Sequence, residues 1–384
     1  MPYTPPTVNY SATNNGTYTT ITGVQSVSIN RGRQRFQDPF PQSSCVVELI
    51  PANSYSLPFA IGQYIDVRAS NTTNTNCYFQ GRITDVERLY DMPYNTVTGA
   101  APADRIRITA TGGTGVLGSN QLVNYSFPSQ NAATTINNLC IEGDVDNFST
   151  GGIEWLAGAP ILSAQTFSGS ALDLMNTLLR SIVGSIDDVA NRGSTKLGVF
   201  PLNRPGDALF IFSDIPGGFN IRFTNLQFLS SVQNTFNEVN VQAPGIATQS
   251  ATGTPPLNSL NYSTYNLTTA ESLNQANYLF TMLSGQVQAC PYVIGVSDAA
   301  QDGIVEDLCK MYNSQQTFGR RILQSTARIT FRGVTSEGII QGVSAVFYED
   351  NATAQVYLSP SLGQPFTLDS SAFGVLDTNR LGYP

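Results

Sequence analysis

The first third of the chain consists of short runs in which apolar and polar residues alternate, the pattern of strands with one buried face. The first run covers 20–30 and is interrupted at Gly23. Four more follow, separated by clusters of Asn, Pro and Gly: Cys45–Ile50, Tyr64–Arg68, Tyr78–Val86 and Arg105–Ala110. This spacing is typical of a small antiparallel barrel or sandwich. We therefore expect residues 1–115 to form one all-β domain.

The period of the apolar residues then changes from two to between three and four, which predicts helices. Ala132–Cys140 is the first such segment. Ser170–Val183 is the clearer one, because its first residue can cap the helix and Gly184 provides a stop. Lys196–Phe200 and Ala208–Phe212 are apolar runs that we expect to form a hairpin. Residues 116–215 are therefore predicted to be a mixed α/β insertion domain.

Strand patterns return at 216–245, most regularly in Asn237–Gln242, and again at 320–360. We expect these two segments to form a second β-barrel. Residues 246–319 would then be a helix-containing insertion within it, and residues 361–384 a C-terminal extension. The predicted order is barrel, α/β insertion, half barrel, insertion, half barrel.

The second insertion contains two recognisable segments. Pro244–Pro256, at its start, carries no charge and is rich in Gly, Ser and Thr, which is typical of an exposed flexible loop. Thr269–Ser284 has helical spacing, with Leu273 and Phe280 on the expected apolar face.

The composition narrows the chemistry available to the chain. Its 384 residues include no histidine, which excludes Ser-His-Asp and Cys-His catalysis, His-ligated zinc and the HExxH motif. Charged residues make up 12%, and 19 Lys and Arg against 27 Asp and Glu give a net charge of −8. Tight nucleic-acid binding needs clustered cations, so we expect no specific nucleic-acid binding. No cofactor is predicted.

Two further classes of protein are not indicated. Residues 1–30 have neither the basic start nor the apolar core of a secretory signal, and no window of about 18 apolar residues would span a membrane. The cysteines are widely spaced without a CxxC pair, which argues against a disulfide framework or zinc site: Cys45, Cys77, Cys140, Cys290 and Cys309. We expect free buried thiols, with a Cys45–Cys77 pair as the alternative.

Three carboxylate clusters are candidates for catalysis or metal binding: Glu142 with Asp144 and Asp146, Asp187 with Asp188, and Glu349 with Asp350. Glycoside hydrolysis needs two facing carboxylates, and calcium needs several oxygen ligands. Each cluster stands beside Gly or Asn in a turn-like context, so we predict local turn or cap roles. We assign no catalytic or metal-binding residue.

Two other patterns have a structural explanation. Thr111–Gly115 reads TGGTG but lacks the ending of a phosphate-binding P-loop and the spacing of a dinucleotide fold, so we expect a loop that leaves a strand. Trp155 and the 17 tyrosines would suit stacking on sugars. Such rings serve equally well in cores and subunit interfaces, and the structural role is favoured.

A family resemblance gives the strongest indication of function. Ser28–Arg35 (SINRGRQR), followed by the strands from 45, 62 and 78, resembles the opening of minor tail proteins of long-tailed bacteriophages, in which a GRxR turn precedes a strand pair. The similarity continues over nearly the whole chain, at Arg105–Thr111, Ala171–Met175, Thr235–Val241 and Phe366–Gly382. The chain departs from the family at Phe36, Gln37, Pro39 and Pro41.

The resemblance implies the fold of phage baseplate hub proteins: mainly β, with two tail-tube-like β-barrels in one chain and α/β insertions between their strands. It also implies a homotrimer in which six similar barrels surround a channel and adapt a sixfold tube to a threefold tip. The implied neighbours are distal tail or tail tube proteins, tail fibre or tip proteins, and the tape measure protein.

We therefore predict a structural tail-tip hub without enzymatic activity, made in the host cytoplasm and located in the virion, through which phage DNA passes without specific binding. An acidic channel wall would repel the DNA backbone. Arg31, Arg33 and Arg35 are candidates for subunit contacts, because arginine pairs bidentately with carboxylates; the alternative is a solvated turn. Two other functions stay open: a distal tail or receptor-binding component, and a carbohydrate-binding protein or glycosidase.

Overall fold

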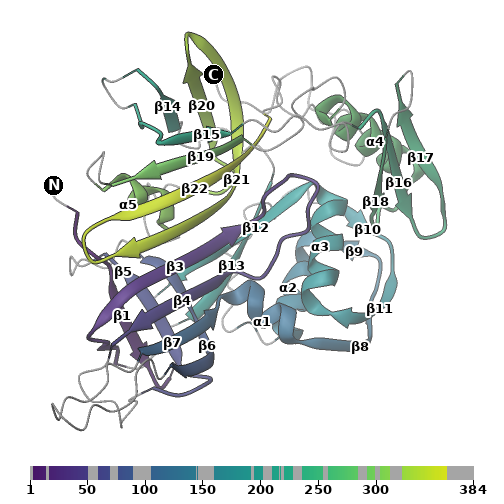
Figure 1. Ribbon diagram of the computed structural model, residues 1–384. Helices are drawn as coiled ribbons and strands as arrows, with labels where there is room; N and C mark the ends of the chain where they lie inside the picture. Colours follow the sequence, from purple (N-terminus) through teal and green to yellow (C-terminus); the bar gives the residue numbers. More distant parts are fainter. Residues whose placement is uncertain are drawn as a thin grey trace, which may run out of the picture.

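A computed structural model shows a mainly β chain with helices between groups of strands (Figure 1). It describes residues 3–13, 17–50, 59–69, 77–89, 105–143, 145, 160–191, 194–201, 210–215, 217, 220–227, 236–253, 258–283, 292–298, 303–311 and 322–360, to which all structural statements refer. No helix in these segments is long and apolar enough to cross a membrane. The prediction of a mainly β fold with α/β insertions is confirmed.

The N-terminal strands form one arm of a 13-stranded sheet, in the order β3-β4-β7-β6-β5-β1-β2. On β4, Cys45, Val47 and Leu49 are buried and their neighbours are partly exposed, as a side-chain period of two requires. The strands predicted from alternation up to residue 115 are all present. Their bounds are β1 Thr7–Ser11, β2 Thr19–Thr20, β3 Val24–Gly32, β4 Ser44–Leu49, β5 Tyr64–Arg68, β6 Cys77–Leu89 and β7 Arg105–Thr111.

The other arm of the sheet comes from the C-terminal half, in the order β15-β19-β22-β21, with β20 on β21 and β14 parallel to β20. Helix α5 (Ile304–Cys309) packs against β19, β21 and β22. The strand bounds are β14 Phe210–Ser213, β15 Asn225–Gln227, β19 Tyr292–Ser297, β20 Thr326–Phe331, β21 Val334–Tyr348 and β22 Ala352–Pro360.

Strands β3 and β21 join the two arms. They pair antiparallel with Val343 opposite Arg31, and buried apolar residues of both arms belong to one core cluster. Gly32 permits the contact: its φ is +76°, and a Cβ there would lie 2.3 Å from the Gln341 carbonyl oxygen. Two tail-tube-like barrels are expected from the sequence. The described strands form one continuous sheet instead, in which neither barrel is closed.

The first insertion is a separate layer of helices and two-stranded sheets beside the N-terminal arm (Figure 1). It has its own apolar core. Its elements are α1 Gly113–Ser119, β8 Gln121–Phe127, β9 Gln130–Asn131, α2 Ala132–Glu142, β10 Ile161–Leu162, β11 Gln165–Ser170, α3 Ala171–Ile182, β12 Gly184–Asn191 and β13 Ser194–Pro201.

Helix α3 is the best-predicted element of this insertion. Ser170 is its N-cap and accepts from the Asp173 N–H at 3.3 Å. Leu172, Met175 and Leu179 are buried, as their spacing predicts. The expected glycine stop is wrong by one residue: Val183 adopts the left-handed conformation, with φ +50°, and strand β12 begins at the following residue.

Two other expectations for this region are wrong. Strand β13 pairs with β12, whereas β14 pairs with β20, so Lys196–Phe200 and Ala208–Phe212 do not form a hairpin. The glycines of TGGTG do not form a loop, because helix α1 begins at Gly113, directly after β7 and Gly112.

The second insertion has a three-stranded sheet covered by one helix (Figure 1). Its elements are β16 Glu238–Ala243, β17 Ile246–Thr252, β18 Ser259–Ser263 and α4 Thr269–Leu283. Strand β16 was expected in the second barrel, but it pairs with β17 and β18. The predicted flexible loop at 244–256 contains β17. Helix α4 buries Ala276, Leu279 and Leu283, whereas Leu273 is exposed, so its expected face is partly wrong.

Candidate functional site: a buried arginine junction

Two of the three arginines in the basic segment lie inside the molecule. Arg31 and Arg33 are each 6% exposed, whereas the Arg35 side chain is 42% exposed. Their partners come from both arms of the sheet, from the loop that follows β3 and from the first insertion. We call Arg31, Arg33 and the residues that contact them the arginine junction.

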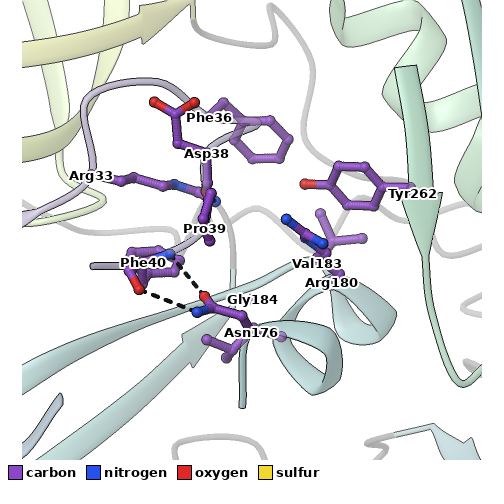
Figure 2. Close-up of a pocket in the computed structure, with 11 residues that line it drawn as sticks. Arg33, Phe36, Asp38, Pro39, Phe40, Asn176, Arg180, Val183, Gly184 and Tyr262 are labelled. Atoms are coloured by element: carbon purple, nitrogen blue, oxygen red, sulfur yellow. Dashed lines mark hydrogen bonds between the residues drawn. The ribbon is translucent and has the colours of Figure 1, made fainter. Parts of the chain in front are cut away.

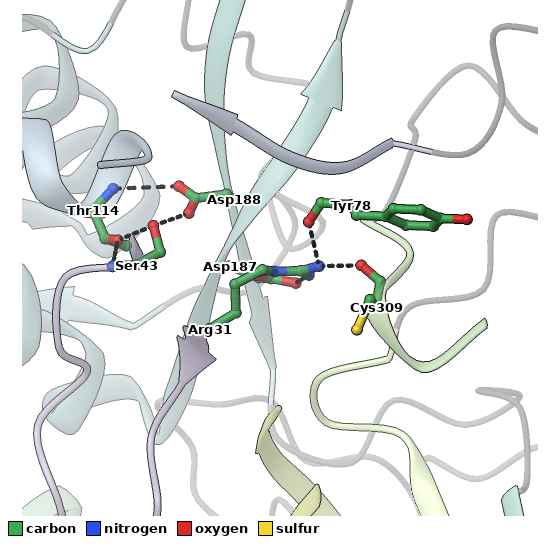
Figure 3. A network of polar contacts seen from close by, with 7 residues as sticks. All are labelled: Arg31, Ser43, Tyr78, Thr114, Asp187, Asp188 and Cys309. Atoms are coloured by element: carbon green, nitrogen blue, oxygen red, sulfur yellow. Dashed lines mark hydrogen bonds and ion pairs between the residues drawn. The ribbon is translucent and has the colours of Figure 1, made fainter. Parts of the chain in front are cut away.

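Arg31 connects four segments that are distant in the sequence (Figure 3). Its Nε and Nη2 atoms donate to Oδ1 and Oδ2 of Asp187 on β12, at 3.2 and 2.6 Å. Its Nη1 atom donates to the Cys309 carbonyl oxygen at the end of α5, at 2.8 Å, and to that of Tyr78 on β6, at 3.5 Å. The planar guanidinium group carries five N–H donors, so it can bind a carboxylate on one edge and carbonyl oxygens on another. Arg31 therefore links both arms of the sheet to the first insertion.

The Arg31–Asp187 pair is almost fully removed from solvent, with side chains 4% and 3% exposed. Burial alone would lower the pKa of Arg31, but the charge and hydrogen bonds of Asp187 outweigh it, so the pKa is raised. Arg31 therefore stays protonated. Loss of either partner would leave an uncompensated buried charge, which is strongly destabilising.

The next carboxylate, Asp188, attaches the first insertion to the start of β4 (Figure 3). Its Oδ2 accepts from the Ser43 hydroxyl, and its Oδ1 accepts from the Thr114 N–H at 3.3 Å. The Thr114 hydroxyl oxygen accepts in turn from the Ser43 N–H at 2.8 Å. Burial raises the pKa of Asp188 to about 6, against the opposing hydrogen bond from Ser43.

These two carboxylates were predicted to have local turn or cap roles. The turn role is wrong, because both lie within β12, although Asp188 accepts from a backbone N–H in the first turn of α1. The sequence contains a signal for the correct structure: Asn191–Ser194 has the turn composition that separates two strands. Glu349 and Asp350 do lie in the bend between β21 and β22, as predicted. Asp144 and Asp146 lie outside the described residues.

Arg33 lies between two aromatic rings. Its Cζ atom is 4.6 Å from the centroid of Phe36 and 4.3 Å from that of Phe40. Its Nε donates to Gln341 Oε1 at 2.8 Å, and its Nη1 donates to the Asp38 carbonyl oxygen at 3.3 Å. Burial lowers the pKa of Arg33 to about 10. The side chain holds loop 33–40 against β21, a role that the sequence pattern did not indicate.

Asn176 on α3 holds the same loop from the other side (Figure 2). Its Oδ1 accepts from the Phe40 N–H at 2.8 Å, and its Nδ2 donates to the Phe40 carbonyl oxygen at 3.2 Å. The second insertion joins α3 nearby, where the Tyr265 N–H donates to Ser181 Oγ at 2.7 Å and Gln275 Nε2 donates to the Arg180 carbonyl oxygen at 2.5 Å. The first insertion is thus held to the loop after β3, and the second insertion is held to the first through α3.

Arg35 is the outermost of the three arginines and pairs with Asp38 at 2.9 Å. Arg31 and Arg33 have their partners within the chain. A contact between these arginines and a second subunit remains a prediction, for which Arg35 is the accessible candidate.

The hydrogen bonds of the junction bind parts of the chain to one another. In the segments that the structure describes, no group of three or more Cys, Asp and Glu is placed to hold a metal ion. Cys45, Cys77, Cys140 and Cys309 are buried and free, as predicted for those four; Cys290 lies outside the described residues. Burial raises the pKa of Cys77 and Cys309 to about 12, so these thiols stay protonated.

An open groove of about 350 Å³ runs beside β8, lined by Asn120–Ser126 and Glu142. Among the described residues, Glu142 is the one carboxylate on this wall, whereas a glycosidase needs two. Trp155, which was considered for stacking on sugars together with the tyrosines, lies outside the described residues. The groove therefore does not present a catalytic pair.

Solved structures of phage tail proteins share this fold. A 43 kDa tail protein of prophage MuSo2 from Shewanella oneidensis matches 92% of this chain and 98% of its own, with TM-score 0.59 and 12% identity. A tail protein from Neisseria meningitidis matches 94% and 97%, with TM-score 0.61 and 10% identity. No family model and no curated protein matches the sequence.

A third structure extends the comparison to secretion systems. A component of the E. coli type VI secretion system, described as structurally similar to T4 bacteriophage tail proteins, matches 89% of this chain and 74% of its own, with TM-score 0.51 and 9% identity. The fold is therefore shared with phage tail proteins. The resemblance inferred from the sequence is confirmed at the level of the fold.

Proposed function

We propose that this protein is the structural hub of a bacteriophage tail tip, three copies of which form a ring around a channel for DNA. The observation that carries the proposal is the agreement of fold over almost the complete chain, 92% and 94% of it against two tail proteins. Such coverage includes the insertions as well as the sheet. Assembly, rather than turnover of a substrate, is the function that this likeness supports.

The hub would connect distal tail or tail tube proteins to tail fibre or tip proteins, with the tape measure protein above it and DNA passing without specific binding. The net charge of −8 supports a conduit, because an acidic wall repels the phosphate backbone. A map of charges on the assembled ring tests this: we expect Asp and Glu on the channel wall, and a wall lined mainly by arginine would contradict it.

Within the hub, we propose that residues 1–115 supply one body and residues 116–215 the first insertion. The second body would combine 216–245 and 320–360, with 246–319 inserted and 361–384 as an extension. Strand pairing refines this division, because β19 and α5 pack with the second body whereas β16 packs with the second insertion.

Copy number is the decisive test of the hub. Cryo-electron microscopy of assembled tails should show three copies of this chain per tip, with β3 and β21 of each copy in the wall of the ring. Six copies in a ring would indicate a distal tail protein, and copies confined to peripheral fibres would indicate a receptor-binding subunit.

Arg35 is our candidate for a contact between subunits. Arg35→Ser should lower the yield of assembled tips while leaving the thermal stability of the isolated chain almost unchanged, because the Arg35–Asp38 pair is partly exposed. Arg332→Ser, at an exposed turn, is the matched control. Normal tip assembly by the Arg35 variant would refute this role.

A further inference from the structure

A very small cavity lies where the sheet and both insertions meet (Figure 2). Its volume is about 10 Å³, which corresponds to one water-sized sphere. The walls come from loop 33–40, from the end of α3 and from β18. The polar side chains on these walls are Arg33, Asp38, Asn176, Arg180 and Tyr262.

Three of these side chains present hydrogen-bond donors to the same space. Figure 2 shows the guanidinium groups of Arg33 and Arg180 and the hydroxyl of Tyr262 directed toward one another. The Nη2 atom of Arg33 is buried and has no partner with full hydrogen-bond geometry among the described residues, although the Tyr262 hydroxyl oxygen lies close enough to interact with the guanidinium. A buried donor without an acceptor is costly and rare in folded proteins, so the geometry points to an acceptor at this position.

The cavity wall is positively charged. Asp38 is the one carboxylate that lines it, but its Oδ1 is paired with Arg35 at 2.9 Å, and Figure 2 shows the carboxylate turned away from Tyr262. The amide of Asn176 is occupied by the backbone of Phe40. Burial lowers the pKa of Arg33, the charges of Tyr262 and Asp38 oppose this shift, and the charge of Arg180 adds to it. The pKa is lowered on balance, and a further negative charge nearby would oppose this lowering.

We propose that this cavity binds one monoatomic anion, with chloride as the ligand. The anion would accept hydrogen bonds from Arg33 Nη2, the Arg180 guanidinium and the Tyr262 hydroxyl. Charged partners strengthen such bonds. The small volume excludes phosphate, sulfate and carboxylates. Chloride is larger than water, so its binding requires the flexible ends of Arg33 and Arg180 to move outward slightly. A bound water would provide an acceptor but no negative charge, and the experiments below separate it from an anion.

The site would couple three parts of the chain. Arg33 follows β3 of the sheet, Arg180 belongs to α3 of the first insertion, and Tyr262 belongs to β18 of the second. An anion held by all three binds only when both insertions are docked. It therefore stabilises the folded chain in proportion to its occupancy.

Bromide provides a direct probe, because it has the charge of chloride and a measurable anomalous signal. Crystals of the full chain soaked in sodium bromide should show an anomalous peak between Arg33, Arg180 and Tyr262. The peak should be absent in Tyr262→Phe and Arg180→Gln. It should persist in Arg332→Gln, a matched variant whose arginine also stacks on a ring, that of Phe331, at 4.9 Å. Ordered water without an anomalous signal would overturn the proposal.

Thermal unfolding gives an independent measurement in solution. At constant ionic strength, replacing chloride with gluconate, which is too large for the cavity, should lower the Tm of the unsubstituted protein and of Arg332→Gln by about 2 °C. Arg180→Gln should unfold cooperatively at the same temperature in both salts. An unsubstituted protein that is indifferent to the exchange, or an Arg180→Gln variant that keeps the difference, would refute the anion site.

Discussion

Arg31 and Asp187 are separated by 156 positions in the chain, yet their side chains form a bidentate ion pair at 2.6 and 3.2 Å in the interior of the protein. The same guanidinium reaches the backbone of α5 and of β6. Because each acceptor belongs to a different part of the fold, this one side chain contributes to the relative positions of the two sheet arms and the first insertion, in addition to the pairing of β3 with β21.

Asp187→Ala should therefore destabilise the chain by about 3–5 kcal/mol, because it leaves the Arg31 charge buried without its partner. The free energy of unfolding, measured by urea titration at pH 7, tests this. Glu337→Ala is the matched control, since it breaks the exposed Arg328–Glu337 pair, which is 3.0 Å long, and should cost less than about 1 kcal/mol. If both variants lowered the free energy of unfolding equally, the buried ion pair would contribute no more to stability than the exposed one.

The stability of the chain should depend on pH through Asp188. Its folded-state pKa is about 6, above the ordinary 3.8, so the folded protein keeps a proton that the unfolded chain has lost. This stabilisation is fully present below about pH 4 and is lost as the pH rises to about 6. Its size is on the order of 3 kcal/mol.

Asp188→Asn should remove that dependence, so the variant should become more stable relative to the unsubstituted protein as the pH rises from 4 to 6. Unfolding free energies at half-unit steps of pH provide the measurement. The exposed Asp85 supplies the control, and its Asn variant should parallel the unsubstituted protein. A parallel curve for Asp188→Asn would contradict the prediction.

The junction of β3 with β21 should be intolerant of any side chain at Gly32. A Cβ there would lie 2.3 Å from the Gln341 carbonyl oxygen, in addition to the strain of φ +76°. Gly333 has a similar φ of +79° but nothing within 4 Å. Gly333→Ala should therefore cost about 1–2 kcal/mol, and Gly32→Ala clearly more. If the Gly32→Ala and Gly333→Ala variants had similar free energies of unfolding, β21 would be able to move away from residue 32 without a loss of stability.

The buried cysteines should be unreactive in the folded protein. Burial raises the pKa of each described thiol, and only the thiolate is alkylated rapidly. Iodoacetamide at pH 8 should leave the peptides containing Cys45, Cys77, Cys140 and Cys309 unmodified. The same peptides should be fully alkylated in urea. Modification of Cys45 or Cys77 in the folded state would contradict their burial.

The sequence predicted element types well where the hydrophobic period was regular. The strands of the N-terminal arm and helix α3 follow from alternation and from the Ser170 cap, because burial of one face imposes a period of two or near 3.6. The sequence did not predict which strands pair with one another. Lys196–Phe200 and Ala208–Phe212 were correctly expected as strands, but the first pairs with β12 and the second with β20, more than 100 residues away.

The candidate site shows the same division. The basic segment was noticed because Arg31, Arg33 and Arg35 stand together, but its carboxylate partner was sought in another subunit, and Asp187 was assigned to a turn. Asn176 and Gln341 carried no signal at all. Their importance arises from being opposite Phe40 and Arg33, which only the folded chain brings about.

By itself the sequence determined the mainly β character, the absence of histidine chemistry and the likeness to tail proteins, because composition and periodicity are local properties of the chain. The tertiary structure alone decided that β3 and β21 join two arms into one sheet and that two arginines are interior side chains. Both depend on contacts between residues hundreds of positions apart, and such contacts leave no periodic trace in the sequence.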